Sequence, residues 1–436
     1  MQYKIFWCKT NKYFTEKWLN SEELKNKSWI FVASCVVTDK AKSKWIKFVK
    51  DTIKGFENKS DKVYLSWCGP IKKWKLNSDF YKIYPELQEF SDKIELLEEE
   101  PEKEINLIDS RVKPENDRVG ENLLFRHPEC SVAKSKDLFK IFTRKYLVIQ
   151  NWCDNNCTFC LTIQARWSHI SREIEEIIEE INSSSAQEVV LTGINIGAWW
   201  ASNTKKFEET KLSELLSQIL EKTKVPRIRI SSLGIEYIND KLLEVFKNPR
   251  IYPHFHLSIQ SGSDKILKLM WRNYSELTLN ETLQKLNILE RKDWVLVSLG
   301  ADIIVGFPGE TDDDFQKSLK LIQKYNITKL HAFPFSSHQN HHIIPASKLD
   351  NQISDKIKRE RMREIMKEAK IVENNFYKKN DWKILKILVE KVSQNSFSGW
   401  SENYIPLNKA NFKPLKNEQI TRWKIFEWRF EYKEAN

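Results

Sequence analysis

Short apolar runs alternate with amphipathic stretches between about residues 140 and 378. The runs KYLVIQ, EVVLTG, RIRISS, HFHLSIQSGS and ADIIVGFPGET predict strands that end in small or polar residues. Between them, apolar residues recur at helical spacing over 174–181 and 212–219, and a charged stretch over 355–379 predicts a long closing helix. Repeated strand–helix pairs favour parallel strands with helices outside and a site at the C-terminal strand ends.

The two ends of the chain differ from this central part. Residues 1–97 alternate between strand-like runs and helices, including a basic helix over 40–54, and predict an open parallel sheet. Residues 98–138 lose periodicity and gain charge and proline, which indicates a linker. Over 379–436, strand-like alternation around the turn-like segments NSFSGWSEN and NKANFKP predicts a small all-β barrel. The expected fold class is α/β: an N-terminal open sheet domain, a central partial (β/α) barrel over 139–378 and the C-terminal barrel.

Composition narrows the function classes. The 436 residues are 41% hydrophobic and 30% charged, which describes a soluble protein of several domains. No apolar run reaches about 18 residues and the N-terminus lacks a secretory pattern, so we expect a cytoplasmic protein without a membrane span. The net charge of +11 favours a polyanionic partner such as nucleic acid, although a merely basic proteome would give the same value.

One tight group stands out among the seven cysteines. Cys153, Cys157 and Cys160 form a C-x3-C-x2-C run directly after the predicted strand KYLVIQ. Three thiolates on one short loop can hold three irons of a 4Fe–4S cluster and leave the fourth iron open. Zinc usually takes four ligands in paired arrangements, and no fourth Cys or His lies suitably near in the sequence. The run therefore favours an iron–sulfur cluster over a zinc site or incidental cysteines.

Three further cysteines end strand-like runs in the N-terminal segment. Cys8 follows YKIFW, Cys35 ends WIFVASC and Cys68 ends VYLSWC. The C-terminal ends of parallel strands gather at one edge of a sheet, so these thiols are placed to converge on a second cluster. The alternative is three cysteines buried in the core. Cys130, in the predicted linker, has no nearby partner and is interpreted as incidental.

The cysteine run resembles the signature of the radical S-adenosylmethionine (radical SAM) superfamily. The whole layout resembles the methylthiotransferase family within it, and most closely the branch that acts on N6-threonylcarbamoyladenosine in tRNA. In the N-terminal segment this likeness rests on CKTN at Cys8 and SCVVT at Cys35. In the central segment it rests on LTGINIG (191–197), RIRISSLG (227–234), HLSIQSGSDKILKLM (256–270), DIIVGFPGETDDDF (302–315) and LHAFPFS (330–336).

The resemblance implies the cofactors and their ligands. It implies two 4Fe–4S clusters and SAM, with a central radical SAM barrel. The catalytic, SAM-cleaving cluster would be held by Cys153, Cys157 and Cys160. An auxiliary cluster that carries the sulfur would be held by Cys8, Cys35 and Cys68. SAM would be contacted by residues that each have an alternative role in turns or packing: Gly193, Asn195, Ser231, Gln260 and Gly306.

The resemblance also implies the reaction, insertion of a methylthio group at carbon 2 of N6-threonylcarbamoyladenosine beside a tRNA anticodon. A C-terminal TRAM-like barrel would contact tRNA phosphates through basic residues that include Lys413, Lys416, Arg422 and Lys424. The electron donor and the sulfur source are not identified, and a monomer is expected. Two related alternatives are methylthiolation of isopentenyladenosine in tRNA or of an aspartate in a ribosomal protein. An alternative of another class is a non-catalytic iron–sulfur protein that binds RNA.

Tryptophan is abundant in this chain and glycine is scarce. There are 16 Trp and only 11 Gly, about 2.5% glycine against a usual value of about 7%. Tryptophan stands where the resembled family has glycine at five positions, Trp7, Trp67, Trp152, Trp167 and Trp200, and Trp271 belongs less securely to the same set. Our hypothesis is that UGA codons read as glycine in the source organism have been rendered as tryptophan. The alternative is genuine tryptophan at tolerant positions.

Overall fold

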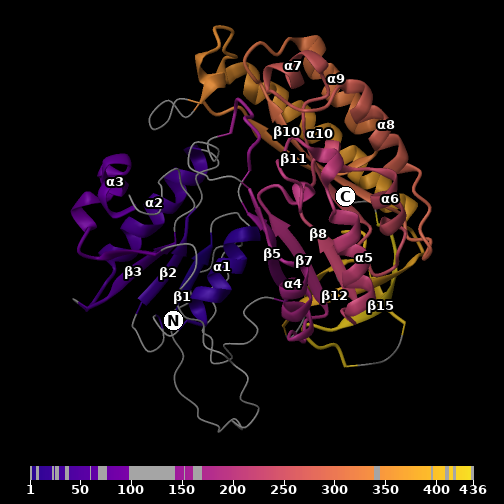
Figure 1. Cartoon of the computed structure of the whole chain (residues 1–436), viewed down its shortest axis with the longest axis horizontal. Coiled ribbons are helices and arrows are strands. Elements are labelled where there is room, and N and C mark those ends of the chain that lie inside the picture. Colours follow the sequence, from indigo (N-terminus) through magenta and orange to yellow (C-terminus); the bar gives the residue numbers. More distant parts are fainter. Residues whose placement is uncertain are drawn as a thin grey trace. The chain divides into compact units, whose positions relative to one another are not determined.

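The computed structural model forms two compact units, Met1–Ile141 and Phe142–Asn436 (Figure 1). It describes residues 2–5, 9–21, 24, 29–34, 39–58, 60–66, 76–97, 143–151, 153–160, 169–337, 344–393, 396–407, 412–415 and 419–433. The predicted linker over 98–138 lies outside these residues, so its boundaries stay a prediction.

The first unit contains a four-stranded sheet in which all strands are parallel. Its strands are β1 (Gln2–Ile5), β2 (Trp29–Ala33), β3 (Lys62–Ser66) and β4 (Ile94–Leu97), in that spatial order. The helices are α1 (Lys9–Leu19), α2 (Asp39–Lys54) and α3 (Leu76–Ile83), with a short 3-10 helix η2 (Pro85–Phe90). The side chains of Phe31, Trp45, Val49, Leu65 and Phe80 are fully buried and form the core of this unit.

The second unit contains six parallel strands that follow one another around a partial barrel (Figure 1). Sheet pairing joins β5 to β7 and β8, and joins β9 to β10 and β11. Isolated parallel bridges at Ile228–Ile251 and Leu233–Leu257 connect the second group to the first. The six strands are β5 (Lys145–Asn151), β7 (Glu188–Gly193), β8 (Arg227–Ile230), β9 (His254–Gln260), β10 (Ser298–Val305) and β11 (Ile327–Pro334). A short strand β6 (Ile170–Ser171) pairs antiparallel with β5.

Helices surround these strands as the hydrophobic periodicity predicts. They are α4 (Ile174–Asn182), α5 (Leu212–Lys222), α6 (Asp240–Phe246), α7 (Asp264–Leu269), α8 (Glu276–Asn287), α9 (Asp312–Lys324) and α10 (Asp355–Lys379). Short 3-10 helices are η4 (Ile196–Ala198), η5 (Phe207–Glu209), η6 (Ile235–Tyr237) and η7 (Pro345–Lys348). The leucine stripe of α5 is fully buried in the main core, so this stripe has a packing role.

Strand alternation gives the barrel a polar inner face. Phe255, Leu257 and Ile259 of β9 belong to the apolar core shared with the helices. His254 and His256 alternate with these residues along β9. They point to the opposite side of the strand, because successive side chains of a strand alternate in direction. The centre of the barrel is therefore lined with groups that must be paired, and its apolar core lies between strands and helices.

Glu188, at the start of β7, is the most heavily paired of these inner groups. Its carboxylate lies 2.6 Å from Arg144 Nε, 2.9 Å from Arg229 Nε and 3.9 Å from Arg227 Nη1. Burial acts to raise the pKa of Glu188, but the arginines outweigh burial and lower it to about 2. One carboxylate thus balances three arginines from the two strands that flank β7, Arg144 directly before β5 and Arg227 and Arg229 in β8.

The C-terminal sheet docks on the N-terminal ends of the barrel strands. Arg144 forms an ion pair with Glu390, and Arg227 Nη2 donates to the Lys386 carbonyl at 2.9 Å. The ring of Tyr404 stacks on His254 with 4.2 Å between centroids. This end of the barrel is closed by the sheet, so the opposite end, where the strands finish, is the one left for a site.

The C-terminal sheet is antiparallel, curled and all-β, in the order β13–β12–β15–β14. The strands are β12 (Ile384–Ser393), β13 (Ser396–Ser401), β14 (Phe412–Pro414) and β15 (Ile425–Phe430). The prediction that NSFSGWSEN and NKANFKP are turns was wrong, because they contain β13 and β14. These segments are rich in polar and small residues, so they lack the apolar alternation that indicates a strand. The strands form through backbone pairing with β12 and β15. The predicted fold class is confirmed.

Among the helices that the structure describes, none has both the length and the apolar character needed to cross a bilayer.

Substituting Glu188→Gln tests the charge cluster under the barrel. Arg227 and Arg229 would lose their carboxylate partner and Arg144 would keep only Glu390, so we expect the free energy of unfolding to fall by about 3–5 kcal/mol. The pKa of Glu188 is lowered on folding, so its stabilising effect is present above a pH of about 4.5 and is lost as the pH falls towards about 2. Chemical denaturation of both proteins across this range measures the difference.

The control is Glu209→Gln, which breaks an exposed ion pair with Lys206 and should change stability far less. Equal losses in the two variants would contradict a special role for Glu188.

Candidate active site

The cysteine loop follows β5 at the rim where the barrel strands end. Cys157 is buried, and Cys153 and Cys160 are partly buried. The loop is tightened by a hydrogen bond from the Cys160 N–H to the Cys157 carbonyl at 3.0 Å. Burial raises the pKa of the Cys153 thiol to about 12 and also raises that of Cys157. Metal binding at this loop must therefore displace bound protons, as is usual for thiolate ligands.

Nitrogen donors are directed at the sulfur atoms of this loop. The Asn155 N–H donates to Cys153 Sγ at 3.4 Å, and Asn195 Nδ2 lies 3.9 Å from the same sulfur. Arg272 Nη1 donates to Cys157 Sγ at 3.4 Å. Hydrogen bonds to sulfur and nearby positive charge stabilise electron-rich cluster thiolates. This donor set fits a 4Fe–4S cluster held by three thiolates.

Arg272 follows the C-terminal end of helix α7, and its side chain is buried. Its Nη2 donates to the Ser258 carbonyl at 3.2 Å and lies 3.8 Å from the carboxylate of Glu236. Its Nε is buried and has no hydrogen-bond partner among the described residues. The guanidinium is held in place by these contacts, but its Nε still lacks an acceptor. It is therefore suited to bind an anionic group added beside Cys157.

The loop is held in place by the C-terminal end of α7. Thr158 donates its N–H to the Met270 carbonyl at 3.2 Å and its hydroxyl to the Leu269 carbonyl at 2.9 Å. Asn273 Nδ2 donates to Asn155 Oδ1 at 3.0 Å. These bonds join segments more than 100 residues apart, so the position of the cysteines depends on the folded barrel.

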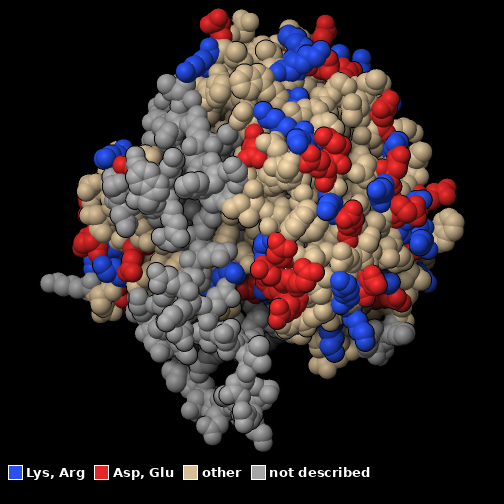
Figure 2. All heavy atoms as spheres, in the orientation of Figure 1, with Lys and Arg blue, Asp and Glu red and all other residues tan. Residues whose placement is uncertain are grey.

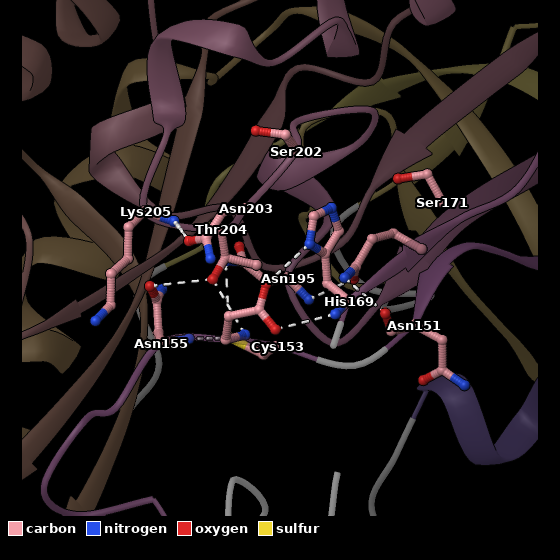
Figure 3. A network of polar contacts seen from close by, with 12 residues as sticks. Asn151, Cys153, Asn155, His169, Ser171, Asn195, Ser202, Asn203, Thr204 and Lys205 are labelled. Carbon is pink, nitrogen blue, oxygen red and sulfur yellow. Dashed lines mark hydrogen bonds and ion pairs between the residues drawn. The ribbon is translucent and has the colours of Figure 1, made fainter. Parts of the chain in front are cut away.

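A second polar network holds the other side of the loop (Figure 3). The Asp154 carboxylate accepts from the His169 N–H at 3.1 Å and lies 3.1 Å from its ring Nδ1. The Asp154 N–H donates to the hydroxyl of Thr204, which in turn donates to Asn155 Oδ1 at 3.3 Å. The segments around His169 and Thr204 thus brace the loop from two sides.

Two predicted SAM-binding residues lie beside this loop. A Cβ on Gly193 would lie 2.3 Å from the Gln150 carbonyl oxygen, so this position also has a packing reason to be glycine. The Asn195 N–H donates to Gln150 Oε1 at 2.8 Å, and its Nδ2 donates to Tyr237 OH at 2.8 Å. Of the five predicted residues, Asn195 is the one brought to a cysteine sulfur.

The other three predicted residues lie along the same rim, at the ends of β8, β9 and β10. Ser231 is buried and donates its N–H to the Leu191 carbonyl at 3.0 Å. Gln260 has a φ of 69°, an unusual backbone for a residue with a side chain. Gly306 has a φ of 71° and donates its N–H to Glu310 Oε2 at 2.8 Å, an oxygen that also accepts from Arg361 Nη1 at 2.7 Å.

The three N-terminal cysteines Cys8, Cys35 and Cys68 lie outside the described residues. The strands that precede them are parallel neighbours, with Ile5, Ala33 and Ser66 aligned across the sheet. The cysteines follow these last strand residues by three, two and two positions.

Sequence reasoning missed several groups of this site. Arg272, His169 and Tyr237 reach the loop or its neighbour Asn195 only through tertiary contacts, and the role of Asp154 shows only in its bond to His169. The one available signal was the position of Asp154 and Asn155 inside the cysteine run. No spacing rule links Arg272 or His169 to the cysteines.

A further cluster lies across β9, β10 and β11. The ligand atoms of His256, Asp302 and His331 lie within 4.8 Å of one another, a grouping able to hold a metal ion. His256 Nε2 is 2.9 Å from Asp302 Oδ1. Burial acts to raise the pKa of Asp302, but the two histidines outweigh it and hold the pKa well below its usual range. The Asp302 carboxylate thus already has both histidines as partners within the cluster.

Comparison with known proteins decides the family. Residues 147–322 match the radical SAM superfamily model. The threonylcarbamoyladenosine tRNA methylthiotransferase MtaB of Thermotoga maritima is 32% identical over 427 residues, which covers 92% of this chain and 89% of that protein. The chain belongs to the radical SAM methylthiotransferase family. Membership implies a 4Fe–4S cluster and SAM as cofactors.

Other methylthiotransferases match over shorter stretches. MtaB of Bacillus subtilis is 32% identical over 67% of this chain and 64% of that protein. A tRNA-2-methylthio-N(6)-dimethylallyladenosine synthase of Aquifex aeolicus is 32% identical over 58% of this chain and 56% of that protein.

Substituting Arg272→Met tests the donor set of the cysteine loop. The variant removes a buried positive charge beside Cys157, so we expect reductive SAM cleavage to slow by about 10- to 100-fold. Arg272→Lys keeps the charge but loses the planar fork, so its rate should be intermediate. Measuring 5′-deoxyadenosine release by the reduced protein gives these rates.

Lys268→Met is the matched control, because this exposed lysine on α7 pairs only with Asp264 among the described residues. An unchanged rate in Arg272→Met would contradict the role given to the guanidinium.

Proposed function

We propose that this protein inserts a methylthio group at carbon 2 of N6-threonylcarbamoyladenosine beside the anticodon of tRNA. The observation that carries the proposal is the match to the Thermotoga maritima enzyme over 92% of this chain. A similarity of that extent reaches well beyond the 176 residues, 147–322, that match the radical SAM model. The geometry of the cysteine loop supports the radical chemistry that such an insertion at an unactivated carbon needs.

We propose that Cys153, Cys157 and Cys160 hold the SAM-cleaving cluster. Together, the bound cluster and SAM supply a 5′-deoxyadenosyl radical. The chain itself fixes the thiols through Thr158 and Asp154, directs Arg272 at Cys157, and closes the other end of the barrel with the C-terminal sheet. Asn195, which lies at both Cys153 and Tyr237, is placed to orient the amino-acid part of SAM.

Gly193, Ser231, Gln260 and Gly306 are proposed as further SAM contacts. Their support is their position after β7, β8, β9 and β10, along the rim that carries the cysteine loop. The Gly306 N–H is bonded to Glu310, which Arg361 holds in place.

A second cluster at Cys8, Cys35 and Cys68 is part of the proposal. It is supported by three adjacent parallel strands that end in register two or three residues before the cysteines. In a parallel sheet such positions share one edge, where ligands bind. The sulfur would be delivered from this cluster, and the sulfur source and the electron donor are partners still to be identified.

Basic elements support tRNA as the macromolecular partner. The sequence of α2 has six Lys and two Asp, a net charge of +4, and α10 has nine basic and five acidic residues, also +4. In the C-terminal sheet Arg422 and Lys424 are exposed, Lys413 pairs with Glu431 at 2.8 Å, and Lys416 lies outside the described residues. Phosphate contacts of this kind give affinity without reading sequence.

The charge is unevenly spread. Figure 2 shows acidic side chains gathered over α4 on the face in view, with mixed charges elsewhere on the described surface. Glu175 and Glu176 begin this helix, and its sequence contains no lysine or arginine. The face around α4 is therefore a poor surface for phosphates.

We place the protein in the cytoplasm as a monomer, where tRNA is available.

The nearest rival substrate is isopentenyladenosine in tRNA. The dimethylallyladenosine synthase match covers 58% of this chain, whereas the threonylcarbamoyladenosine match covers 92%. The wider coverage favours the threonylcarbamoyl nucleoside. A ribosomal-protein aspartate and a non-catalytic role have no comparable support.

Nucleoside mass spectrometry of tRNA from source cells that lack the gene tests the proposal. We expect the methylthio form of threonylcarbamoyladenosine to disappear and the unmethylthiolated nucleoside to accumulate. The native gene should restore the modification, and a Cys157→Ala copy should not. Persistence of the methylthio threonylcarbamoyl nucleoside would reject the proposal, and loss of methylthio isopentenyladenosine instead would establish the rival.

Lysines of α2 provide a test of phosphate contact. Lys44, Lys47 and Lys54 are exposed and share one face of the helix. Changing all three to Gln should weaken tRNA binding and reduce the slope of log affinity against log salt by roughly two to three. Fluorescence anisotropy with labelled tRNA over a salt series measures both quantities.

The control triple is Lys206, Lys247 and Lys285 changed to Gln, because each already pairs with a carboxylate at 2.9, 2.6 and 2.7 Å. Equal slopes in the α2 variant and the unaltered protein would exclude α2 from the tRNA surface.

A further inference from the structure

Tryptophan occurs in this structure with a backbone conformation that suits glycine. Among the described residues, eight other than glycine have φ between 50° and 69°, and five of them are tryptophan: Trp200, Trp271, Trp294, Trp382 and Trp423. Only two described glycines, Gly306 and Gly309, have positive φ. Side chains with a Cβ rarely adopt this region, and those that do are mostly Asn and Asp.

Trp271 occupies the glycine position of a helix C-terminal motif. Helix α7 ends with Met270 as its C-cap. The Trp271 N–H donates to the Lys268 carbonyl at 3.0 Å, and the Arg272 N–H donates to the Leu267 carbonyl at 2.9 Å. This bond pair defines a Schellman motif, in which the residue after the C-cap is left-handed and usually glycine. Trp271 has a φ of 55° at that position.

Trp200 occupies the glycine position of a type II turn. The Ala201 N–H donates to the Ala198 carbonyl at 3.0 Å, which closes a four-residue turn. Trp199, the second residue, has φ −53° and ψ 124°, and Trp200, the third, has φ 64°. These angles are those of a type II turn, whose third residue must have positive φ and is normally glycine.

Two other tryptophans lie in similar turns. A bond of 3.1 Å from the Lys383 N–H to the Asn380 carbonyl makes Trp382 the third residue of its turn, with φ 62°. Trp294 is the last residue of a turn closed by its own N–H to the Arg291 carbonyl at 3.2 Å, with φ 58°. Glycine is favoured at both positions.

Four of the five left-handed tryptophans are exposed, and the fifth, Trp423, is partly buried. Trp200, Trp271, Trp294 and Trp382 are 38%, 57%, 80% and 64% exposed. Trp18, Trp45, Trp199 and Trp428 are at most 4% exposed and have ordinary backbones. Buried tryptophans contribute to the core, whereas the exposed set has strained backbones and little packing to compensate for them.

We infer that Trp200, Trp271, Trp294, Trp382 and Trp423 are glycines in the protein that the source organism makes, because its UGA codons are read as glycine. UGA differs by one base from both the tryptophan codon UGG and the glycine codon GGA. The buried group remains tryptophan. The sequence hypothesis named Trp200 and Trp271; the backbone adds three positions and separates Trp200 from its neighbour Trp199. Trp7, Trp67, Trp152 and Trp167 lie outside the described residues.

The reassignment alters the surroundings of the cysteine loop. Trp271 lines a cavity of about 830 Å³ together with Thr158, Leu269, Pro345 and Leu349. Thr158 belongs to the loop and bonds to the end of α7 directly before Trp271. With glycine at 271, the indole leaves this wall and the cavity beside the loop becomes wider.

Mass spectrometry of the protein purified from its source organism tests the inference. The tryptic peptide of residues 173–205 contains both Trp199 and Trp200. We expect fragmentation to place tryptophan at 199 and glycine at 200, glycine at 294 in the peptide of residues 293–317, and tryptophan at 428 in the peptide of residues 425–429. Tryptophan at 200 or 294, or glycine at 199 or 428, would overturn it.

Recombinant variants test the physical reason independently. Trp200→Gly should raise the equilibrium constant for folding by about threefold or more, because it relieves left-handed strain. Trp199→Gly is the matched control, since it empties a buried position and should lower that constant. Denaturant unfolding of both variants and of the unaltered chain gives the two ratios. A loss of stability in Trp200→Gly would contradict the claim that the backbone at position 200 is strained by a side chain.

Discussion

The common direction of six barrel strands is the constraint on which the site depends. Because β5 and β7 to β11 are parallel and follow one another in space, their C-terminal ends form one rim. The cysteine loop leaves this rim from β5, and the predicted SAM contacts leave it from the next four strands. Residues separated by more than 150 positions in the chain are thereby brought to one rim of the barrel. No local sequence feature could produce this arrangement without the parallel order.

The same parallel arrangement brings buried charges together at the opposite end of the barrel. Parallel strands place Glu188 and three arginines at neighbouring strand beginnings, away from water. Buried charges are tolerated only when they are paired, and here one carboxylate serves three guanidinium groups while Glu390 of the C-terminal sheet adds a second. The C-terminal sheet therefore closes this end of the barrel and helps to neutralise its buried charge.

Much of this fold could be predicted from the sequence because its elements follow simple periodicities. The leucine stripe of α5 and the apolar run of β7 gave the barrel strands and helices, and the spacing of Cys153, Cys157 and Cys160 indicated the cluster site. β13 and β14 were missed because their stability comes from pairing rather than from apolar content. Arg272 and His169 were missed because tertiary contacts alone bring them to the loop. The glycine shortage was visible in composition and the family resemblance pointed to Trp200 and Trp271, but only the backbone angles add Trp294, Trp382 and Trp423.

The tryptophan angles also have an energetic consequence. A left-handed backbone costs a residue with a side chain roughly 1–2 kcal/mol, so five such tryptophans would cost about 5–10 kcal/mol. The whole stability of a folded domain is about 5–15 kcal/mol. Glycine at these positions removes this cost, and it makes the protein from the source organism the proper material for functional work.

The central claim is that two independent clusters serve one reaction. The most direct measurement is Mössbauer spectroscopy with iron and sulfide analysis of the protein from its source organism, compared with two triple variants. Alanine at positions 153, 157 and 160 should remove one 4Fe–4S cluster and abolish SAM cleavage. Alanine at positions 8, 35 and 68 should remove the other cluster and leave SAM cleavage in place. A single cluster in the unaltered protein, or loss of the same cluster in both variants, would contradict the account.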